Sequence, residues 1–117
     1  MKKICTTKEQ SQKLIELGLD VNTADMWLQH IGYSVIDGIE SPLYLPTIVR
    51  DEPTDKDIPA WSLTVLLDIL AEQDFIIKTI GNEFNIDIPI RHCKIWFSSL
   101  LDAAFEMVVW MKKNGKI

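Results

Sequence analysis

Apolar residues recur every three or four positions between Ser99 and Gly115, and this spacing predicts an α-helix. Ser99 and Asp102 have the spacing of a capping box, and Gly115 after two lysines is typical of a helix end. Two neighbouring faces of this helix are apolar: Leu101, Ala104, Phe105, Val108 and Met111 on one, and Leu100, Ala103, Met107 and Trp110 on the other. A sheet covers one face, so we expect the second to pack on another helix, a loop or another subunit.

Two further segments have helical patterns. Thr6 and Glu9 have capping-box spacing, which predicts a first helix from about Thr7 to Leu17 that Gly18 ends. In residues 57–70, DIPAWSLTVLLDIL, the first helical turn is expected to contain Pro59, near a cap at position 57 or 58. This middle helix is also apolar on two sides, so we expect it to pack against the C-terminal helix as well as on a sheet.

The first strand pattern runs from Met26 to Ile36, where β-branched and aromatic residues favour a strand and Gly32 indicates a bulge or bend. Asp37 and Gly38 form a hairpin turn, and the return strand covers 43–49. Pro46 within that return strand predicts a position at the edge of the sheet. An irregular segment over 28–49 is the open alternative to this hairpin.

A second hairpin is predicted from residues 75–80, a turn at Gly81 and Asn82, and residues 83–90. The return strand alternates apolar and polar residues, which is typical of a half-buried strand. A third strand is expected to follow, with Cys93, Ile95 and Phe97 facing inward and His92, Lys94 and Trp96 facing outward.

The order of these elements predicts a single α+β domain over residues 1–117. We expect one antiparallel sheet of about 4–5 strands and three helices. The C-terminal and middle helices are expected to pack on one face of that sheet. The 47% hydrophobic and 25% charged composition is that of an ordinary soluble globular protein.

Charge and composition narrow the possible locations and partners. The net charge is −5 and the pI about 4.9, so the chain as a whole repels nucleic acid and anionic membranes. The N-terminus MKKICTTKEQ lacks the apolar core of a signal peptide, and no apolar run reaches the roughly 20 residues of a membrane span. Cys5 and Cys93 are expected to be reduced. We therefore expect a cytoplasmic protein that makes no contact with a membrane.

No catalytic or metal-binding pattern is found in the sequence. Phosphate-loop, dinucleotide-binding, nucleophile-elbow and zinc-protease motifs are all missing. His92 and Cys93 are neighbours that point to opposite faces of a strand, which makes a poor joint metal site. Asp102 and Glu106 share a helix face, but a solvated polar stripe explains them. We therefore expect no catalytic, metal-ligating or cofactor-binding residue, no cofactor and no enzyme activity.

Tryptophan carries the strongest functional signal, because four tryptophans are many for 117 residues and tryptophan is enriched at interfaces. Trp110 lies on the second apolar face of its helix beside Met107, and Trp96 is expected on the outer side of a strand beside Lys94. These four residues, Trp96, Lys94, Trp110 and Met107, form the interaction surface that the sequence predicts.

Three blocks of the chain resemble a group of small uncharacterised proteins of gut Bacteroidetes, often encoded on prophage or other mobile elements. The blocks are TTKEQSQKLIELGLDVNTADMW, DIPAWSLTVLLDIL and LDAAFEMVVWMKKNGKI. The group has no established activity, cofactor or catalytic residue. The resemblance implies a genomic context and a bacterial cytoplasm, but no mechanism.

The leading hypothesis is a non-enzymatic protein-binding or adaptor module that binds an unknown protein or itself, for example as a homodimer. One alternative is a nucleic-acid accessory protein of a mobile element, which would use Arg91, Lys94 and Trp96 to meet phosphates and stack bases; the acidic pI argues against it. The other alternative is a small hydrolase with a Cys93 or Asp102 site.

Overall fold

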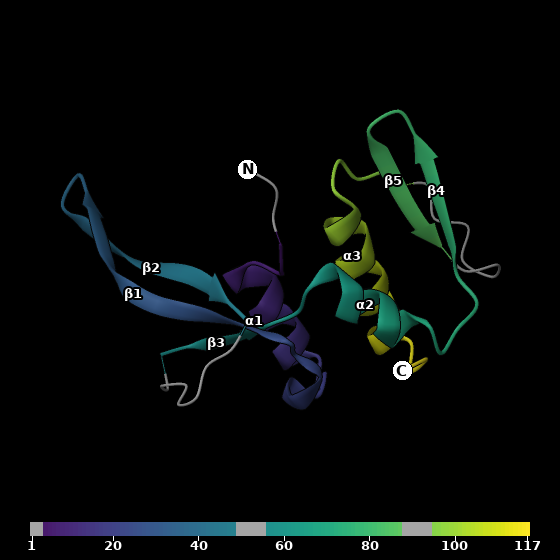
Figure 1. The fold of residues 1–117 in the computed structure, drawn as a ribbon, viewed down its shortest axis with the longest axis horizontal. Coiled ribbons are helices and arrows are strands. Elements are labelled where there is room, and N and C mark those ends of the chain that lie inside the picture. Colours follow the sequence, from purple (N-terminus) through teal and green to yellow (C-terminus); the bar gives the residue numbers. More distant parts are fainter. Residues whose placement is uncertain (1–3, 49–55, 88–94) are drawn as a thin grey trace.

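The computed structural model describes residues 4–48, 56–87 and 95–117, and in these ranges the chain is α+β (Figure 1). The elements are α1 (Lys8–Glu16), a 3₁₀ turn η1 (Val21–Thr23), β1 (Met26–Ile36), β2 (Ile39–Thr47), β3 (Ile58–Ala60), α2 (Leu63–Leu70), β4 (Ile76–Ile80), β5 (Glu83–Asp87) and α3 (Leu100–Lys113). The predicted mixed fold class, with three helices and antiparallel strands, is confirmed.

The strands form two sheets, so the expectation of one sheet of 4–5 strands is wrong. One sheet has three strands in the order β2-β1-β3, and the other is the β4-β5 hairpin. Helices α2 and α3 lie between the two sheets (Figure 1). Both helices are apolar on two sides, and they lie where one continuous sheet would have to pass.

The main core is built by α2, α3, β5 and the end of α1. The residues of α3 from both predicted apolar faces are buried, apart from Leu100 and Trp110, which are partly buried, and α3 packs against α2 and β5. The predicted packing between the two helices is therefore confirmed. The end of α3 also follows the prediction: Gly115 has φ 67°, and the N–H of Lys116 donates to the carbonyl of Met111 at 2.9 Å.

Trp61 joins the N-terminal region to this core. Its side chain is fully buried, and its indole N–H donates to the hydroxyl of Thr23 at 2.9 Å. Its backbone N–H donates to the Thr6 hydroxyl at 3.0 Å, and its carbonyl accepts from the Thr6 N–H at 2.9 Å. Buried polar groups need such partners, so this tryptophan fixes the position of the residues that precede α1.

The prediction for the start of the middle helix is wrong. Residues 58–60 form strand β3, in which Ala60 pairs with Met26, and α2 begins after Ser62. The Ser62 hydroxyl accepts the Val65 N–H at 3.3 Å, which makes Ser62 the N-cap. Pro59 is tolerated in β3 because this strand is an edge of its sheet.

The first helix has the predicted extent but a different cap. Thr7 and Gln10 form a reciprocal capping box, while Thr6 is buried and bonds to the Ser11 hydroxyl at 2.8 Å. Gly18 ends the helix at φ 86°, as predicted. The helix is tied to α3 because the Gln10 amide donates to Asp102 at 2.8 Å, so Asp102 is not only a solvated residue as we expected.

The predicted second hairpin is confirmed as β4 and β5 as far as Asp87. Beside β5, Phe84 and Phe97 exchange two backbone hydrogen bonds of 2.7 and 2.8 Å, and the Asn85 amide donates to the carbonyl of Ile95. The predicted third strand is thus one isolated bridge in the described residues, since 88–94 lie outside them. The polar residues Asn85 and Asp87 are buried, so β5 does not have the polar exposed face that its alternating pattern predicts.

Candidate functional site

The β1–β2 hairpin extends away from the helices, and most residues of its outer half are exposed (Figure 1). Asp37 and Gly38 both have positive φ, 53° and 78°, as a tight hairpin turn requires. The hairpin prediction is therefore confirmed, and the irregular alternative is not observed. Its return strand begins at Ile39, four residues before the predicted start.

A β-bulge divides strand β1 and decides which side chains share a face. His30 pairs with Tyr44 and Gly32 pairs with Leu43, which leaves Ile31 as the extra residue. In an uninterrupted strand Gly32 would lie on the face of His30. With the extra residue, Tyr33 takes that place, and its ring lies 4.8 Å from the His30 ring at 67°.

The hairpin therefore has two faces of different chemistry. We call the first the aromatic face; it carries His30, Tyr33, Pro42 and Tyr44. We call the second the aliphatic face; it carries Ile36, Ile39, Leu43 and Leu45. The four aliphatic side chains are between 42% and 70% exposed, so the described chain covers them only in part.

The open edge of β2 is a poor template for another strand. Pro42 and Pro46 lack an N–H, and β2 forms an edge of its sheet, as Pro46 predicted. In an edge strand, every second N–H group points away from the sheet. Pro42 and Pro46 occupy two of these outward positions, and Tyr44 lies between them. Two of the four outward-facing positions of β2, namely 40, 42, 44 and 46, therefore lack the N–H donor that an added strand would need.

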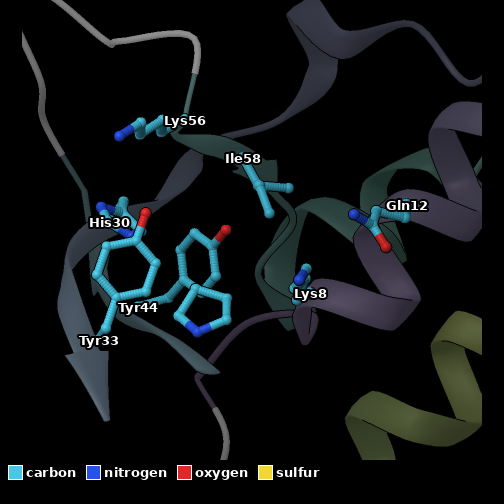
Figure 2. Close-up of a pocket in the computed structure, with 8 residues that line it drawn as sticks. Lys8, Gln12, His30, Tyr33, Tyr44, Lys56 and Ile58 are labelled. Atoms are coloured by element: carbon cyan, nitrogen blue, oxygen red, sulfur yellow. The ribbon is translucent and has the colours of Figure 1, made fainter. Parts of the chain in front are cut away.

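A pocket of about 390 Å³ lies where the aromatic face meets α1 (Figure 2). It is lined by Lys8, Gln12, His30, Tyr33, Pro42, Tyr44, Lys56 and Ile58. Tyr44 packs on a small second core of Cys5, Met26, Leu28 and Ala60, which holds its side chain in place. The ammonium group of Lys8 lies 5.6 Å from the centre of the Tyr44 ring, within cation–π range.

His30 forms the inner wall of this pocket. Its ring meets the rings of Tyr33 and Tyr44 edge to face, with centroids 4.8 and 5.6 Å away. Its backbone N–H donates to the Asp57 carboxylate at 3.0 Å. Its Nε2 atom is buried and has no hydrogen-bond partner among the described residues. The imidazole thus holds both tyrosine rings from behind and does not face solvent through Nε2.

The structure describes three of the four predicted interaction residues, and none of these three is fully exposed. Met107 is fully buried in the core, and Trp110 and Trp96 are half-buried. Lys94 lies outside the described residues, as does Arg91 of the nucleic-acid alternative. An interaction role for Trp96, Lys94 and Trp110 stays a prediction, while the largest group of exposed apolar side chains that the structure describes lies on the β1–β2 hairpin, with further exposed isoleucines on β4.

The scarcity of charged residues in the sequence points to the hairpin surface, to which the tryptophan positions do not point. The segment from 26 to 48 contains only two charged residues, Asp37 and Glu40, and no lysine or arginine. A segment this poor in charge belongs in a core or an interface, yet a two-stranded ribbon has no core of its own.

The candidates for chemistry remain unsupported. Cys5 is buried, and burial, followed by the Asp25 carboxylate, raises the pKa of its thiol. Cys93 and His92 lie outside the described residues. In the part of the chain that the structure describes, no three His, Cys, Asp or Glu side chains are grouped as a metal site requires. None of the helices in these ranges combines the length and apolar character of a membrane span.

Comparison of the chain with protein-family models, with curated proteins and with solved structures found no match. The resemblance to the Bacteroidetes group accordingly stays a prediction.

Proposed function

We propose that this protein is a non-enzymatic protein-binding module that associates with itself through the aliphatic face of the β1–β2 hairpin. The observation that carries the proposal is the exposure of Ile36, Ile39, Leu43 and Leu45 side by side on this ribbon. Contiguous exposed apolar patches with a polar surround mark interaction sites in soluble proteins.

The free energy available from covering this face is substantial. Burial of one large aliphatic side chain contributes roughly 1.5–3 kcal/mol, and these four side chains are already about half removed from water. In a symmetric dimer each side chain counts twice. The resulting gross gain, on the order of 10 kcal/mol, exceeds the lower estimates of the entropy cost of association, so we expect a weak dimer.

The chemistry of the face favours a second copy of this chain as the partner. Between its aliphatic residues the aliphatic face carries only Gln29, Gly32, Ser34 and Ser41, so it has no charged side chain. Two copies therefore meet without burying an ion, and a twofold axis makes one patch complementary to itself.

The test is sedimentation equilibrium of the purified chain and of an Ile39→Lys variant. The charge would be buried twice in a symmetric dimer, so we expect the dimer dissociation constant to rise more than tenfold. Val21→Lys is the matched control, because Val21 is an exposed aliphatic residue of η1 away from the hairpin. A wild-type chain that stays monomeric at hundreds of micromolar, or an equal effect of both variants, contradicts the proposal.

A further inference from the structure

We propose that the pocket between α1 and the base of the β1–β2 hairpin binds a small phosphorylated ligand. Lys8 and Lys56 would hold the phosphate, and an apolar or planar part of the ligand would lie on the rings of Tyr33 and Tyr44. The site lies on the aromatic face, so it is separate from the aliphatic face and independent of the association proposed above.

The size and construction of the pocket suit a small molecule. Its volume of about 390 Å³ is near the lower end of the range for ligand sites. Three parts of the chain build it: α1, the hairpin, and the residues at the start of β3. Several of its wall groups are rings or branched side chains that lose little conformational entropy when a ligand binds, namely Tyr33, Tyr44, Pro42 and Ile58.

The charge of the lining departs from that of the whole chain. Acidic residues outnumber basic ones by 17 to 12 in the sequence. Nevertheless, among the described residues that line the pocket there are two lysines and no carboxylate. Neither Lys8 nor Lys56 forms an ion pair within the described part of the chain. An anion in the pocket would supply the partner that both ammonium groups lack.

The neutral donors add to the same preference. Tyr33 and Tyr44 are the only tyrosines of the chain, and both line this pocket. Their hydroxyl groups point to the same side of it, toward Lys56 (Figure 2). Two ammonium and two phenolic groups offer more donors than the two oxygens of a carboxylate require, whereas a phosphate monoester has three terminal oxygens and nearly two charges.

The remaining surface of the pocket is suited to an apolar body. The rings of Tyr33, Tyr44 and Pro42 and the side chain of Ile58 provide flat or branched apolar walls. His30 acts as a positioning residue, because its edge-to-face contacts hold both tyrosine rings in place. A ligand with an aromatic ring next to its phosphate therefore matches the pocket better than phosphate alone.

The test follows the two tyrosine signals by NMR of the full chain labelled with ¹³C at the tyrosine rings, at constant ionic strength. The probes are phenyl phosphate, inorganic phosphate and benzoate. We expect phenyl phosphate to shift both signals in a saturable manner and to bind at least fivefold more tightly than inorganic phosphate, with benzoate weakest. Absence of a saturable shift, or equal binding of benzoate and phenyl phosphate, overturns the proposal.

Charge-neutral variants localise the binding. Lys8→Gln and Lys56→Gln should each weaken phenyl phosphate binding about tenfold, since each removes one charge-assisted contact. Lys78→Gln removes the same charge from exposed strand β4 and serves as the control. Circular dichroism of all three variants checks that the fold is retained. Equal affinities of the three folded variants would show non-specific charge attraction and would overturn the assignment of this pocket.

Discussion

At the scale of single residues, Trp61 contributes more to the stability of the fold than the partly exposed tryptophans do. It is fully buried, and it bonds to the Thr23 hydroxyl through its indole and to Thr6 through its backbone. The chain segments on either side of Trp61 belong to different elements, β3 and α2. Loss of its packing should therefore affect both ends of the molecule at once.

A Trp61→Phe substitution tests this role. We expect it to lower the free energy of unfolding by about 2–3 kcal/mol, because it leaves a cavity and removes the indole N–H that donates to the Thr23 hydroxyl. Urea unfolding measured by circular dichroism gives the value. Trp27→Phe is the control, since Trp27 is half-buried on the hairpin; it should cost less than half as much. Equal costs would contradict the central position of Trp61.

The Cys5 thiol gives a prediction about pH. Burial, and then the Asp25 carboxylate, raises its pKa above the ordinary 9.0, so the folded state favours the neutral thiol. The resulting stability is fully present below about pH 9 and is lost as the pH rises through the folded pKa. In a Cys93→Ser background, the unfolding free energy should fall between pH 8.5 and 10.5, and Cys5→Ala should flatten that dependence. An unchanged slope in Cys5→Ala would refute it.

At the scale of elements, local patterns were enough for most helices and for both hairpins. The caps at Ser99 and Gly115, the extent of β1 and the turn at Asp37 are all consequences of neighbours in sequence. The middle helix was placed too early because Pro59 suits both a first helical turn and an edge strand. Only the pairing of Ala60 with the distant Met26 decides between them, and no local pattern contains it.

The sites were harder to predict than the elements. The pocket combines Lys8, Lys56 and the hairpin, which are separated in sequence and meet only through the fold. The order of the elements along the chain predicts a single sheet, but helices α2 and α3 lie between two separate groups of strands. Whether the hairpin is exposed also depends on whether other elements pack on it, and the hydrophobic periodicity of the strands does not reveal this.

The bulge at Ile31 gives a prediction for the element that bears the pocket. Insertion of one residue into β2 between Leu43 and Tyr44, opposite Ile31, should restore a regular ladder, bring Gly32 into phase with His30 and turn Tyr33 to the opposite face. Contacts between the rings of His30 and Tyr33 should then disappear from nuclear Overhauser spectra, while those between His30 and Tyr44 persist. Retention of both sets of contacts would show that the bulge does not control the face.

At the scale of the whole molecule, the hairpin makes the chain longer than its core requires. The radius of gyration is 15.5 Å, against about 13 Å for a compact chain of this length. The main core joins α1, α2, α3 and β5, whereas the outer half of the β1–β2 hairpin contributes no side chain to it. The two regions should therefore differ in local stability.

Hydrogen exchange measures this difference. Amides of α3 between 104 and 111 should exchange only through global unfolding, because their side chains are almost all buried. Amides of residues 33–41 should exchange at least a hundredfold faster in a dilute, monomeric sample. If the aliphatic face pairs two copies, protection of the hairpin should rise with protein concentration while that of α3 stays constant. Equal protection of both regions in the monomer would be inconsistent with a hairpin outside the core.

The two prolines of β2 have a consequence for the size of any assembly. Strands that join edge to edge leave a new edge free after every addition, so such growth has no natural end and leads to fibres. Faces related by a twofold axis cover each other completely, and growth stops at two copies. With Pro42 and Pro46 obstructing the edge and the aliphatic face left open, the hairpin permits a finite pair and discourages a polymer.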